Sequence, residues 1–403
     1  MKYFVMLCDG MADEPTAKLG GKTPMMVAKK PNIDFLASKG EVGLVKTVQD
    51  GMKPGSDVAN LAVLGYNSYE CYSGRSPLEA ASIGIDLKDT DVTFRCNLVT
   101  LSDEDNYEDK HMVDYCGGDI STPEARELIK CLQDNLGNDE FSFYAGVAYR
   151  HCLVWDKGNP HPGVLTPPHD IPGKVIKDYV PKGEDTAKLY EFMKKSYDLL
   201  MNHPVNQKRI AEGKRPANSA WFWGEGTKPQ LADFKKKTGL NGSMISAVDL
   251  LKGIAICANM TSVDVDGTTG YIDTNFEGKC QAAIDEFRRG QDFVYVHVEA
   301  PDECGHRGEA ENKVRAIELI DEKILGPVVE YLRTQGDFAV LVCPDHPTPL
   351  DIQTHTSTPV PYVIYDSKNE VDSGVTTINE DTAKTTGNYI EKGYTMIDRL
   401  FSK

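Results

Sequence analysis

The 403-residue sequence predicts an α/β protein whose mainly parallel sheet is covered by helices on both faces. Short apolar runs alternate with amphipathic stretches at both ends of the chain, which is the pattern of such a sheet. Turn-rich and acidic segments interrupt this alternation in the middle of the chain. We therefore expect one α/β domain, residues 1–89 and 186–403, and an inserted α+β cap domain at residues 90–185.

Four apolar runs are the clearest strands of the larger domain. Their hydrophobicity is nearly continuous, as expected of parallel strands that are buried on both faces. The predicted strands are Tyr3–Cys8, Phe293–Val298, Phe338–Cys343 and Val360–Tyr365.

The clearest helix is predicted over residues 310–335, where apolar residues recur at helical spacing. Pro327 lies inside this pattern, so we expect a kink or the start of a second helical segment there. In the inserted segment, Val92–Leu101 and Phe141–Asp156 are predicted to be extended. The sequence Ser121-Thr122-Pro123-Glu124 predicts a helix start, because a hydroxyl can cap the free amides and proline fits the first turn.

Charge and composition exclude several classes of partner. The formal net charge is −17, which disfavours binding to nucleic acid or to anionic membranes. No apolar run approaches the roughly 18 residues of a membrane-spanning helix. The apolar run at Tyr3–Cys8 stops at Asp9, too early for a signal peptide. The ten cysteines are scattered without a CxxC pair, so we expect buried thiols in a reducing compartment and a cytoplasmic location.

Aspartate and histidine residues follow three of the predicted strands. Ligands bind beyond the carboxyl ends of the strands in an open parallel sheet, so these side chains are expected to meet at one edge. Carboxylate and imidazole together suit two divalent ions, Mn²⁺ first and Mg²⁺ or Zn²⁺ as alternatives. Singly, each residue has a simpler interpretation as a turn, a helix cap, a surface pair or a solvated imidazole. The candidate metal ligands are Asp9, Asp302, His306, Asp345, His346 and His355.

Ser56 is the candidate nucleophile. It lies in Pro54-Gly55-Ser56-Asp57, directly before an apolar run, so its hydroxyl is expected at a turn that opens a helix. Free amides at such a position can hold phosphate oxygens, and a bound metal ion would lower the pKa of the hydroxyl. The alternative is that Ser56 only caps the helix.

These residues resemble one known family, the cofactor-independent phosphoglycerate mutases of the shorter archaeal type, within the alkaline-phosphatase superfamily. The resemblance covers nearly the whole chain. The matching segments are Val5–Gly10, Pro54–Gly65, Tyr72–Gly84, Asn241–Met260, Gly270–Lys279, His297–Gly308 and Cys343–Thr348.

The resemblance implies an alkaline-phosphatase-like fold and a role for each site residue. One ion would be bound by Asp302, His306 and His355, and the other by Asp9, Ser56, Asp345 and His346. Ser56 would become the phosphoserine, and Lys279 would lie near it as a further catalytic group. Arg75 and Arg95 lie in segments that would flank the pocket.

The sequence departs from the family in the inserted segment. Archaeal-type mutases have an arginine-rich motif there, but the corresponding stretch, Val113–Asp119, contains no arginine. Tyrosine or cysteine cannot replace bidentate guanidinium contacts to an anion. His111, Arg150 and His151 remain as candidate substrate contacts beside Arg75 and Arg95.

The expected activity is interconversion of 3-phosphoglycerate and 2-phosphoglycerate, a glycolytic isomerisation of a small phosphorylated metabolite. The phosphoryl group would pass through Ser56 while the inserted domain excludes water. Three alternatives stay open: a homoserine-kinase-like phosphotransferase acting on a small hydroxy amino acid, a phosphomonoesterase, and a metal-binding protein without catalysis.

Overall fold

The computed structural model describes residues 1–402 and divides into two compact units. The first unit comprises Met1–Tyr72 together with the chain from Gln230 onward, and the second comprises Ser73–Pro229. The boundaries expected from the sequence, at residues 89/90 and 185/186, both lie inside the second unit. The second unit extends beyond residues 90–185 on both sides along the chain.

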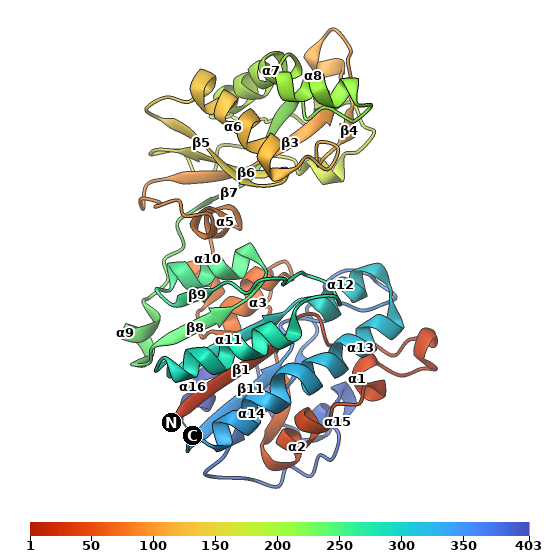
Figure 1. Cartoon of the computed structure of the whole chain (residues 1–403), viewed down its shortest axis with the longest axis vertical. Helices are drawn as coiled ribbons and strands as arrows, with labels where there is room; N and C mark the ends of the chain where they lie inside the picture. The colour runs from red at the N-terminus through yellow and green to blue at the C-terminus, as the bar shows by residue number, and fades with distance from the viewer. Residues whose placement is uncertain (403) are drawn as a thin grey trace. The chain divides into compact units, whose positions relative to one another are not determined.

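The first unit is built on an eight-stranded sheet, of which Figure 1 labels β1, β8, β9 and β11. With β8 (Gly242–Ile245), β9 (Thr261–Val263) and β13 (Tyr389–Ile390), the strand order is β13-β2-β12-β11-β1-β10-β8-β9. β1 (Lys2–Cys8) lies between β10 (Phe293–Val298) and β11 (Phe338–Cys343) and is parallel to both. β12 (Val360–Asp366) is antiparallel to its neighbours β11 and β2 (Glu41–Val45). The mainly parallel sheet and the four predicted strands are confirmed.

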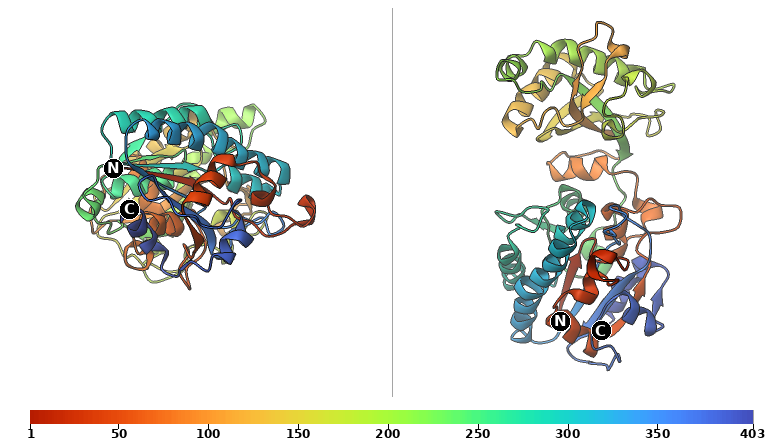
Figure 2. Two further views of the ribbon diagram at one scale, coloured as in Figure 1. Left: turned by 90° about the horizontal axis from the view of Figure 1, so that it is seen from below. Right: turned by 90° about the vertical axis from the view of Figure 1, so that its right-hand side faces the viewer.

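Helices cover both faces of this sheet, because successive side chains of each strand point to opposite sides. Phe4, Met6 and Cys8 of β1 belong to a core that includes side chains of the helices α2 (Pro31–Lys39), α11 (Phe276–Arg288), α13 (Ala310–Ile320) and α14 (Gly326–Arg333). Over this face, α14 continues the direction of α13, and α11 packs beside α14; these are the teal to blue helices of Figure 2. On the other face, Tyr3 contacts Phe401 of α16 (Met396–Phe401), and Tyr295 donates a hydrogen bond to Asn60 of α3 (Ser56–Val63).

The first unit has three further short strands and a set of helices. Two further strands are parallel to their neighbours, β8 (Gly242–Ile245) and β9 (Thr261–Val263), and β13 (Tyr389–Ile390) pairs with β2. The helices are α1 (Pro24–Val27), α2 (Pro31–Lys39), α3 (Ser56–Val63), α4 (Ser68–Cys71), α9 (Phe234–Thr238), α10 (Asp249–Cys257), α11 (Phe276–Arg288), α12 (Ala300–Arg307), α13 (Ala310–Ile320), α14 (Gly326–Arg333), α15 (Glu380–Thr385) and α16 (Met396–Phe401).

The helix predicted over residues 310–335 is divided by a π-helical turn, Asp321–Leu325, between α13 and α14. Pro327 lies in the first turn of α14, as expected of a residue that begins a second segment. The buried Asp321 carboxylate accepts hydrogen bonds from the backbone amides of Ile33 (2.7 Å) and Asn32 (3.2 Å) at the start of α2. A carboxylate satisfies free amides at a helix start, so Asp321 fixes α2 against this turn.

The second unit contains an antiparallel sheet of order β4-β3-β6-β5. A further strand, β7, lies outside this path and also pairs with β3. β7 (Ser219–Thr227) pairs with β3 (Val92–Leu101), and α5 (Ser76–Ser82) contacts both strands. Through such contacts, residues 73–89 and 186–229 belong to the second unit together with residues 90–185. Its other elements are β4 (Met112–Asp114), β5 (Phe141–Val147), β6 (Arg150–Trp155), α6 (Thr122–Leu136), α7 (Ala187–Met201) and α8 (Pro204–Ala211).

The predicted helix start in this unit is confirmed at α6, where Ser121 and Glu124 form a reciprocal capping box. Side chains of α6 and α7 pack with the strands in one apolar core. Among residues 1–402, no helix combines the length and the apolar content that crossing a membrane requires.

Candidate active site

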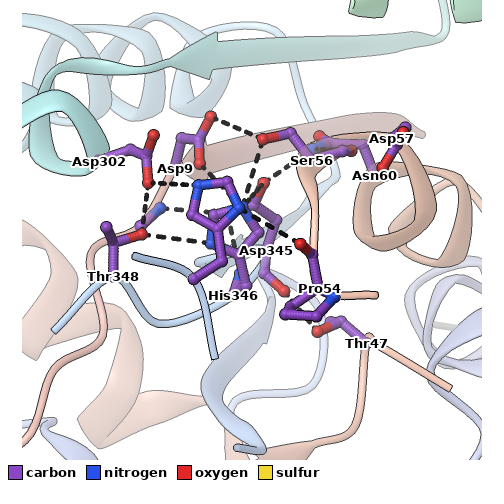
Figure 3. A network of polar contacts seen from close by, with 12 residues as sticks. Asp9, Thr47, Pro54, Ser56, Asp57, Asn60, Asp302, Asp345, His346 and Thr348 are labelled. Atoms are coloured by element: carbon purple, nitrogen blue, oxygen red, sulfur yellow. Dashed lines mark hydrogen bonds and ion pairs between the residues drawn. The ribbon is translucent and has the colours of Figure 1, made fainter. Parts of the chain in front are cut away.

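Three strand ends bring the predicted acidic residues together in the first unit. β1, β10 and β11 are adjacent and parallel, so the chain segments that follow them leave the sheet at the same edge. Asp9 follows β1, Asp302 lies in α12 after β10, and Asp345 follows β11. Figure 3 shows these side chains grouped around His346 and Ser56. The three strand ends thus bring these side chains together at one edge of the sheet.

Gly10 allows these segments to approach one another closely. Its φ is +61°, a left-handed conformation that glycine adopts without a steric penalty. A Cβ atom at this position would lie 2.6 Å from both the Cα of Asp302 and the Oγ1 of Thr348. Any larger residue would therefore push α12 and the loop after β11 away from Asp9.

One group of donors consists of Asp302, His306 and His355. The Nε2 atoms of His306 and His355 each lie 3.3 Å from a carboxylate oxygen of Asp302. The same two nitrogens lie 2.9 Å from each other. Only one of two facing imidazole nitrogens can donate to the other, so the second presents its lone pair. His355, in a loop nine residues beyond His346, thus reaches Asp302 as predicted.

A second group of donors surrounds Ser56. Its Oγ lies 3.3 Å from Nε2 of His346 and 3.5 Å from Oδ2 of Asp9. Nε2 of His346 also lies 3.4 Å from Oδ2 of Asp345 and 3.6 Å from Oδ1 of Asp9. Asp9, Asp345 and His346 are all buried, whereas Ser56 is only partly so.

Helix α3 places Ser56 at this group. Gly55 is its N-cap in an extended conformation, and Ser56 is the first helical residue. One turn later, the buried Asn60 donates to the carbonyl oxygen of Ser56 (2.8 Å) and to Oδ2 of Asp345 (2.9 Å). Asn60 also accepts a hydrogen bond from Tyr295 of β10 (2.6 Å). The position of the serine is therefore fixed by contacts to two strand segments.

Buried polar contacts fix the loop after β11. The ammonium of Lys313, fully buried in α13, donates to Oδ2 of Asp13 (2.7 Å) and to the carbonyl oxygen of Thr348 (2.8 Å). The hydroxyl of Thr348 donates to Oδ1 of Asp302 and lies 3.4 Å from Nδ1 of His346. Thr348 thus contacts one residue of each donor group.

Electrostatics distinguish the two groups. Burial, followed by the neighbouring carboxylates of Asp345 and Asp302, raises the pKa of Asp9 well above its usual range. Burial also acts to raise the pKa of Asp302, but its contacts with His306 and His355 outweigh burial and hold that pKa well below the usual range. The neighbouring carboxylates therefore disfavour the ionised form of Asp9, whereas the histidine contacts of Asp302 favour its ionised form.

The donors present fit divalent cations. Asp302, His346 and His355 offer ligand atoms within 4.8 Å of one another, as do Asp9, Asp345 and His346. Oδ1 of Asp9 is buried without a hydrogen-bond partner, which is costly unless a positive group lies there. Mixed carboxylate and imidazole donors are those that Mn²⁺ and Zn²⁺ accept.

Lys279 lies on α11 and is buried next to this site. Its Nζ donates to the carbonyl oxygen of His297 (2.7 Å). Burial lowers its pKa to about 8, although the charges of Glu299 and Asp9 act in the opposite direction. Lys279 is therefore connected to the second donor group through His297, whose ring lies 2.8 Å from Asp9.

The five candidate substrate contacts all belong to the second unit. Glu79 joins two of them, because its carboxylate oxygens lie 2.7 Å from Nε of Arg75 and 2.9 Å from Nε of Arg95. The Arg95 guanidinium also lies 4.2 Å from the ring centroid of Trp223. His111 pairs with Glu104, and Arg150 lies over the ring of Tyr149.

His151 does not fit the role of an anion contact. Its imidazole is buried on β6, and its Nδ1 accepts a hydrogen bond from the backbone amide of Gly146 (3.0 Å). Burial lowers its pKa to about 3, so the ring is neutral at physiological pH. A buried neutral imidazole offers no charge to a phosphate or carboxylate, and we do not retain His151 as a substrate contact.

Sequence reasoning missed three residues of the site, His297, Asn60 and Thr348. His297 lies within β10, and its Nε2 lies 2.8 Å from Oδ2 of Asp9. A polar residue inside a buried apolar run was the available signal for His297 and also for Asn60 in α3. Thr348 lies in a loop that has no such pattern, so only the fold reveals it.

For the protein stripped of metal ions, we expect the free energy of unfolding to fall as the pH rises from 6.5 to 8, a range that stops at the pKa of about 8 where Lys279 loses its proton. Asp302 raises the pKa of His306 to about 9 from 6.5. A raised histidine pKa gives stability that is complete below the unfolded pKa and is lost through the folded pKa. His306 is about one-third exposed (34%), so solvent screening limits the loss to about 1–2 kcal/mol.

Urea unfolding of the chelated protein at several pH values measures this loss. Asp302→Asn removes the charge that raises the pKa of His306, so the variant should lose less stability over the same pH range. An identical pH dependence in the wild type and the variant would contradict the prediction.

Comparisons with known proteins agree with this geometry. A family model described as 2,3-bisphosphoglycerate-independent phosphoglycerate mutase matches residues 37–206. A probable mutase of this description from Geobacter sulfurreducens is 48% identical over 403 residues, covering 100% of both chains. A mutase from Methanosarcina barkeri is 48% identical over 385 residues, covering 95% of both chains. The chain belongs to the 2,3-bisphosphoglycerate-independent phosphoglycerate mutase family.

Solved structures show the same fold. A protein from Pyrococcus horikoshii superposes with a TM-score of 0.81 at 26% identity, covering 100% of this chain and 96% of that one. The cofactor-independent phosphoglycerate mutase from Thermoplasma acidophilum superposes with a TM-score of 0.65 at 26% identity, covering 100% and 99%. The predicted family and fold class are confirmed. The relatives from Geobacter sulfurreducens, Methanosarcina barkeri and Thermoplasma acidophilum are described as phosphoglycerate mutases, so they give no support to the homoserine-kinase-like alternative.

Proposed function

We propose that the chain interconverts 3-phosphoglycerate and 2-phosphoglycerate through a phosphoserine at Ser56. Relatives that are 48% identical over nearly their whole length are described as mutases with this activity. The observation that supports Ser56 as the carrier is its place at the start of α3, where its hydroxyl lies within 3.5 Å of both Asp9 and His346. A hydroxyl among such donors would have little purpose in a protein that only binds metal.

Two divalent ions are proposed at the two donor groups, with Mn²⁺ as the preferred ion. Asp302, His306 and His355 would hold one, and the second would lie among Asp9, Ser56, Asp345 and His346. When bound, such ions neutralise phosphoryl oxygens and lower the pKa of a coordinated hydroxyl. The unpartnered Oδ1 of Asp9 and the crowded carboxylates support this assignment.

The proposed reaction is two transfers of one phosphoryl group. In the first, the bond from phosphorus to the 3-oxygen of the glycerate breaks as the bond to Oγ of Ser56 forms. The proton that Ser56 loses is matched by the one that the 3-hydroxyl gains. In the second, the 2-hydroxyl loses its proton and takes the phosphoryl group, and Ser56 regains its hydroxyl hydrogen. No water is consumed.

The chain contributes positioning and positive charge to these transfers. Asn60 holds the backbone of Ser56 and the carboxylate of Asp345, so both keep their places while the phosphoryl group moves. Lys279 is proposed to stabilise the negative charge of the transferring group, which is supported by its burial beside His297, the neighbour of Asp9. Arg75 and Arg95, which Glu79 holds together, are the proposed contacts for the substrate carboxylate. His111 and Arg150, beside Glu104 and Tyr149, stay predictions for the same role.

An assay with Mn²⁺-loaded protein and 3-phosphoglycerate tests this proposal. We expect ³¹P NMR to show 2-phosphoglycerate at equilibrium without added bisphosphoglycerate and without release of inorganic phosphate. A chelator should abolish the conversion and added Mn²⁺ should restore it, because both donor groups need cations.

Two outcomes would overturn the proposal. Release of inorganic phosphate in place of 2-phosphoglycerate would identify a phosphomonoesterase. Full activity in the chelated protein would show that the donor groups do not act through metal ions.

A further inference from the structure

His297 has two hydrogen-bonding partners in the interior of the first unit. It lies in β10, its side chain is fully buried, and it interrupts an otherwise apolar run. Its Nε2 lies 2.8 Å from Oδ2 of Asp9, and its Nδ1 lies 3.2 Å from Oγ of Ser246. The imidazole therefore joins a candidate metal ligand to the segment that follows β8.

The partners of His297 determine which ring nitrogen carries the hydrogen. As a metal ligand, Asp9 is ionised and can only accept hydrogen bonds, so Nε2 of His297 carries the ring hydrogen and donates it to Asp9. Nδ1 is then unprotonated and accepts the hydroxyl hydrogen of Ser246, whose Oγ accepts a hydrogen bond from the backbone amide of Val248 (3.0 Å).

This hydrogen bond from His297 determines which carboxylate oxygen of Asp9 remains available to a cation. Oδ2 of Asp9 is occupied by His297, whereas Oδ1 is buried without a hydrogen-bond partner and faces Nε2 of His346 at 3.6 Å. A carboxylate held through one oxygen cannot rotate freely, and its other oxygen stays available to a cation. Without the donor, both oxygens of Asp9 would lack strong partners in a buried site.

The main chain of His297 makes the second connection. Its carbonyl oxygen accepts a hydrogen bond from Lys279. One residue of β10 therefore positions both Asp9, through its ring, and Lys279, through its backbone. Because only the ring contact depends on the side chain, substitutions of His297 test the connection to Asp9 alone.

We propose that His297, whose ring is held by a hydrogen bond from Ser246, is a positioning residue that orients Asp9 toward the second cation. This inference rests on the proposed function, because it assumes that Asp9 is a metal ligand. A hydrogen-bonded partner that orients a ligand contributes about 10–100-fold to metal affinity or activity.

The test compares four variants with the wild-type protein. His297→Leu removes the donor at similar size, and His297→Gln keeps a side-chain N–H that can reach Asp9. Ser246→Ala removes the hydroxyl that holds the ring of His297 through Nδ1. Ser243→Ala is the matched control, because Ser243 is also a buried serine of the same β8 region that donates to a carboxylate, that of Glu286, outside the site.

Calorimetric titration of each chelated protein with Mn²⁺ measures the effect independently of activity. We expect two binding transitions in the wild type, one of which weakens about 10–100-fold in His297→Leu while the other is unchanged. His297→Gln should recover most of the affinity, Ser246→Ala should be intermediate, and Ser243→Ala should match the wild type. At saturating Mn²⁺, kcat should fall in His297→Leu while KM for 3-phosphoglycerate changes little.

The outcomes separate this inference from the proposed function. If the wild type binds no Mn²⁺, the proposed function fails and the inference fails with it. If the wild type binds two ions and His297→Leu binds both equally well with an unchanged kcat, only the inference is overturned. If His297→Leu does not fold, His297→Gln and Ser246→Ala are compared with the wild type. Equal Mn²⁺ affinity in Ser246→Ala and the wild type would overturn the inference.

Discussion

Ser56→Ala is expected to abolish the mutase reaction, with a fall in kcat/KM of about four to six orders of magnitude. Alanine leaves no oxygen at this position of α3 to accept the phosphoryl group. The free energy of unfolding should change by less than about 1 kcal/mol, because the Ser56 hydroxyl makes only contacts of 3.3 and 3.5 Å.

Two measurements test this result. Mass spectrometry of the wild-type protein quenched with 3-phosphoglycerate should show a phosphoryl group on the peptide that contains Ser56, and the variant should show none. Ser68→Ala is the control, because Ser68 donates to the carbonyl oxygen of Val58 in the same helix without contacting the site. It should keep full activity. Turnover that persists in Ser56→Ala would rule out the phosphoserine.

Asp302→Asn is expected to remove one of the two bound cations and to lower activity by about 10³-fold or more. Asp302 contacts both His306 and His355, so its charge is central to that donor group. Loss of several kcal/mol of charge stabilisation in the transition state corresponds to about three orders of magnitude in rate. Metal analysis after dialysis against Mn²⁺ should find one ion per chain in the variant and two in the wild type.

Asp321→Asn provides the matched control for a buried aspartate. Asp321 lies in the same unit and accepts hydrogen bonds from α2, and burial raises its pKa. Its variant should lose stability but keep both ions and full activity. If Asp302→Asn binds two ions and turns over at the wild-type rate, the assignment of this donor group is wrong.

Local sequence signals were sufficient for the central strands of the first unit and for its longest helical stretch. Continuous apolar runs gave β10 and β11 with the bounds that the structure has, and Pro327 marked the start of a second helical segment. The signals are strong because a parallel strand is buried on both faces and tolerates few polar residues. The extent of the inserted unit was not recoverable in this way, because β7 joins β3 from more than 100 residues away along the chain.

The sequence by itself determined the residue types of the site and the edge of the sheet at which they meet. Asp9, Asp302 and Asp345 each follow an apolar run, and the rule that parallel strands end at one edge sufficed to group them. Only the tertiary structure decided which atoms face one another. His355 reaches Asp302 from a loop, Thr348 contacts both donor groups, and His297 orients Asp9. These contacts depend on packing between segments that are distant in the chain, and a hydrogen bond of about 3 Å is fixed by that packing rather than by local propensity.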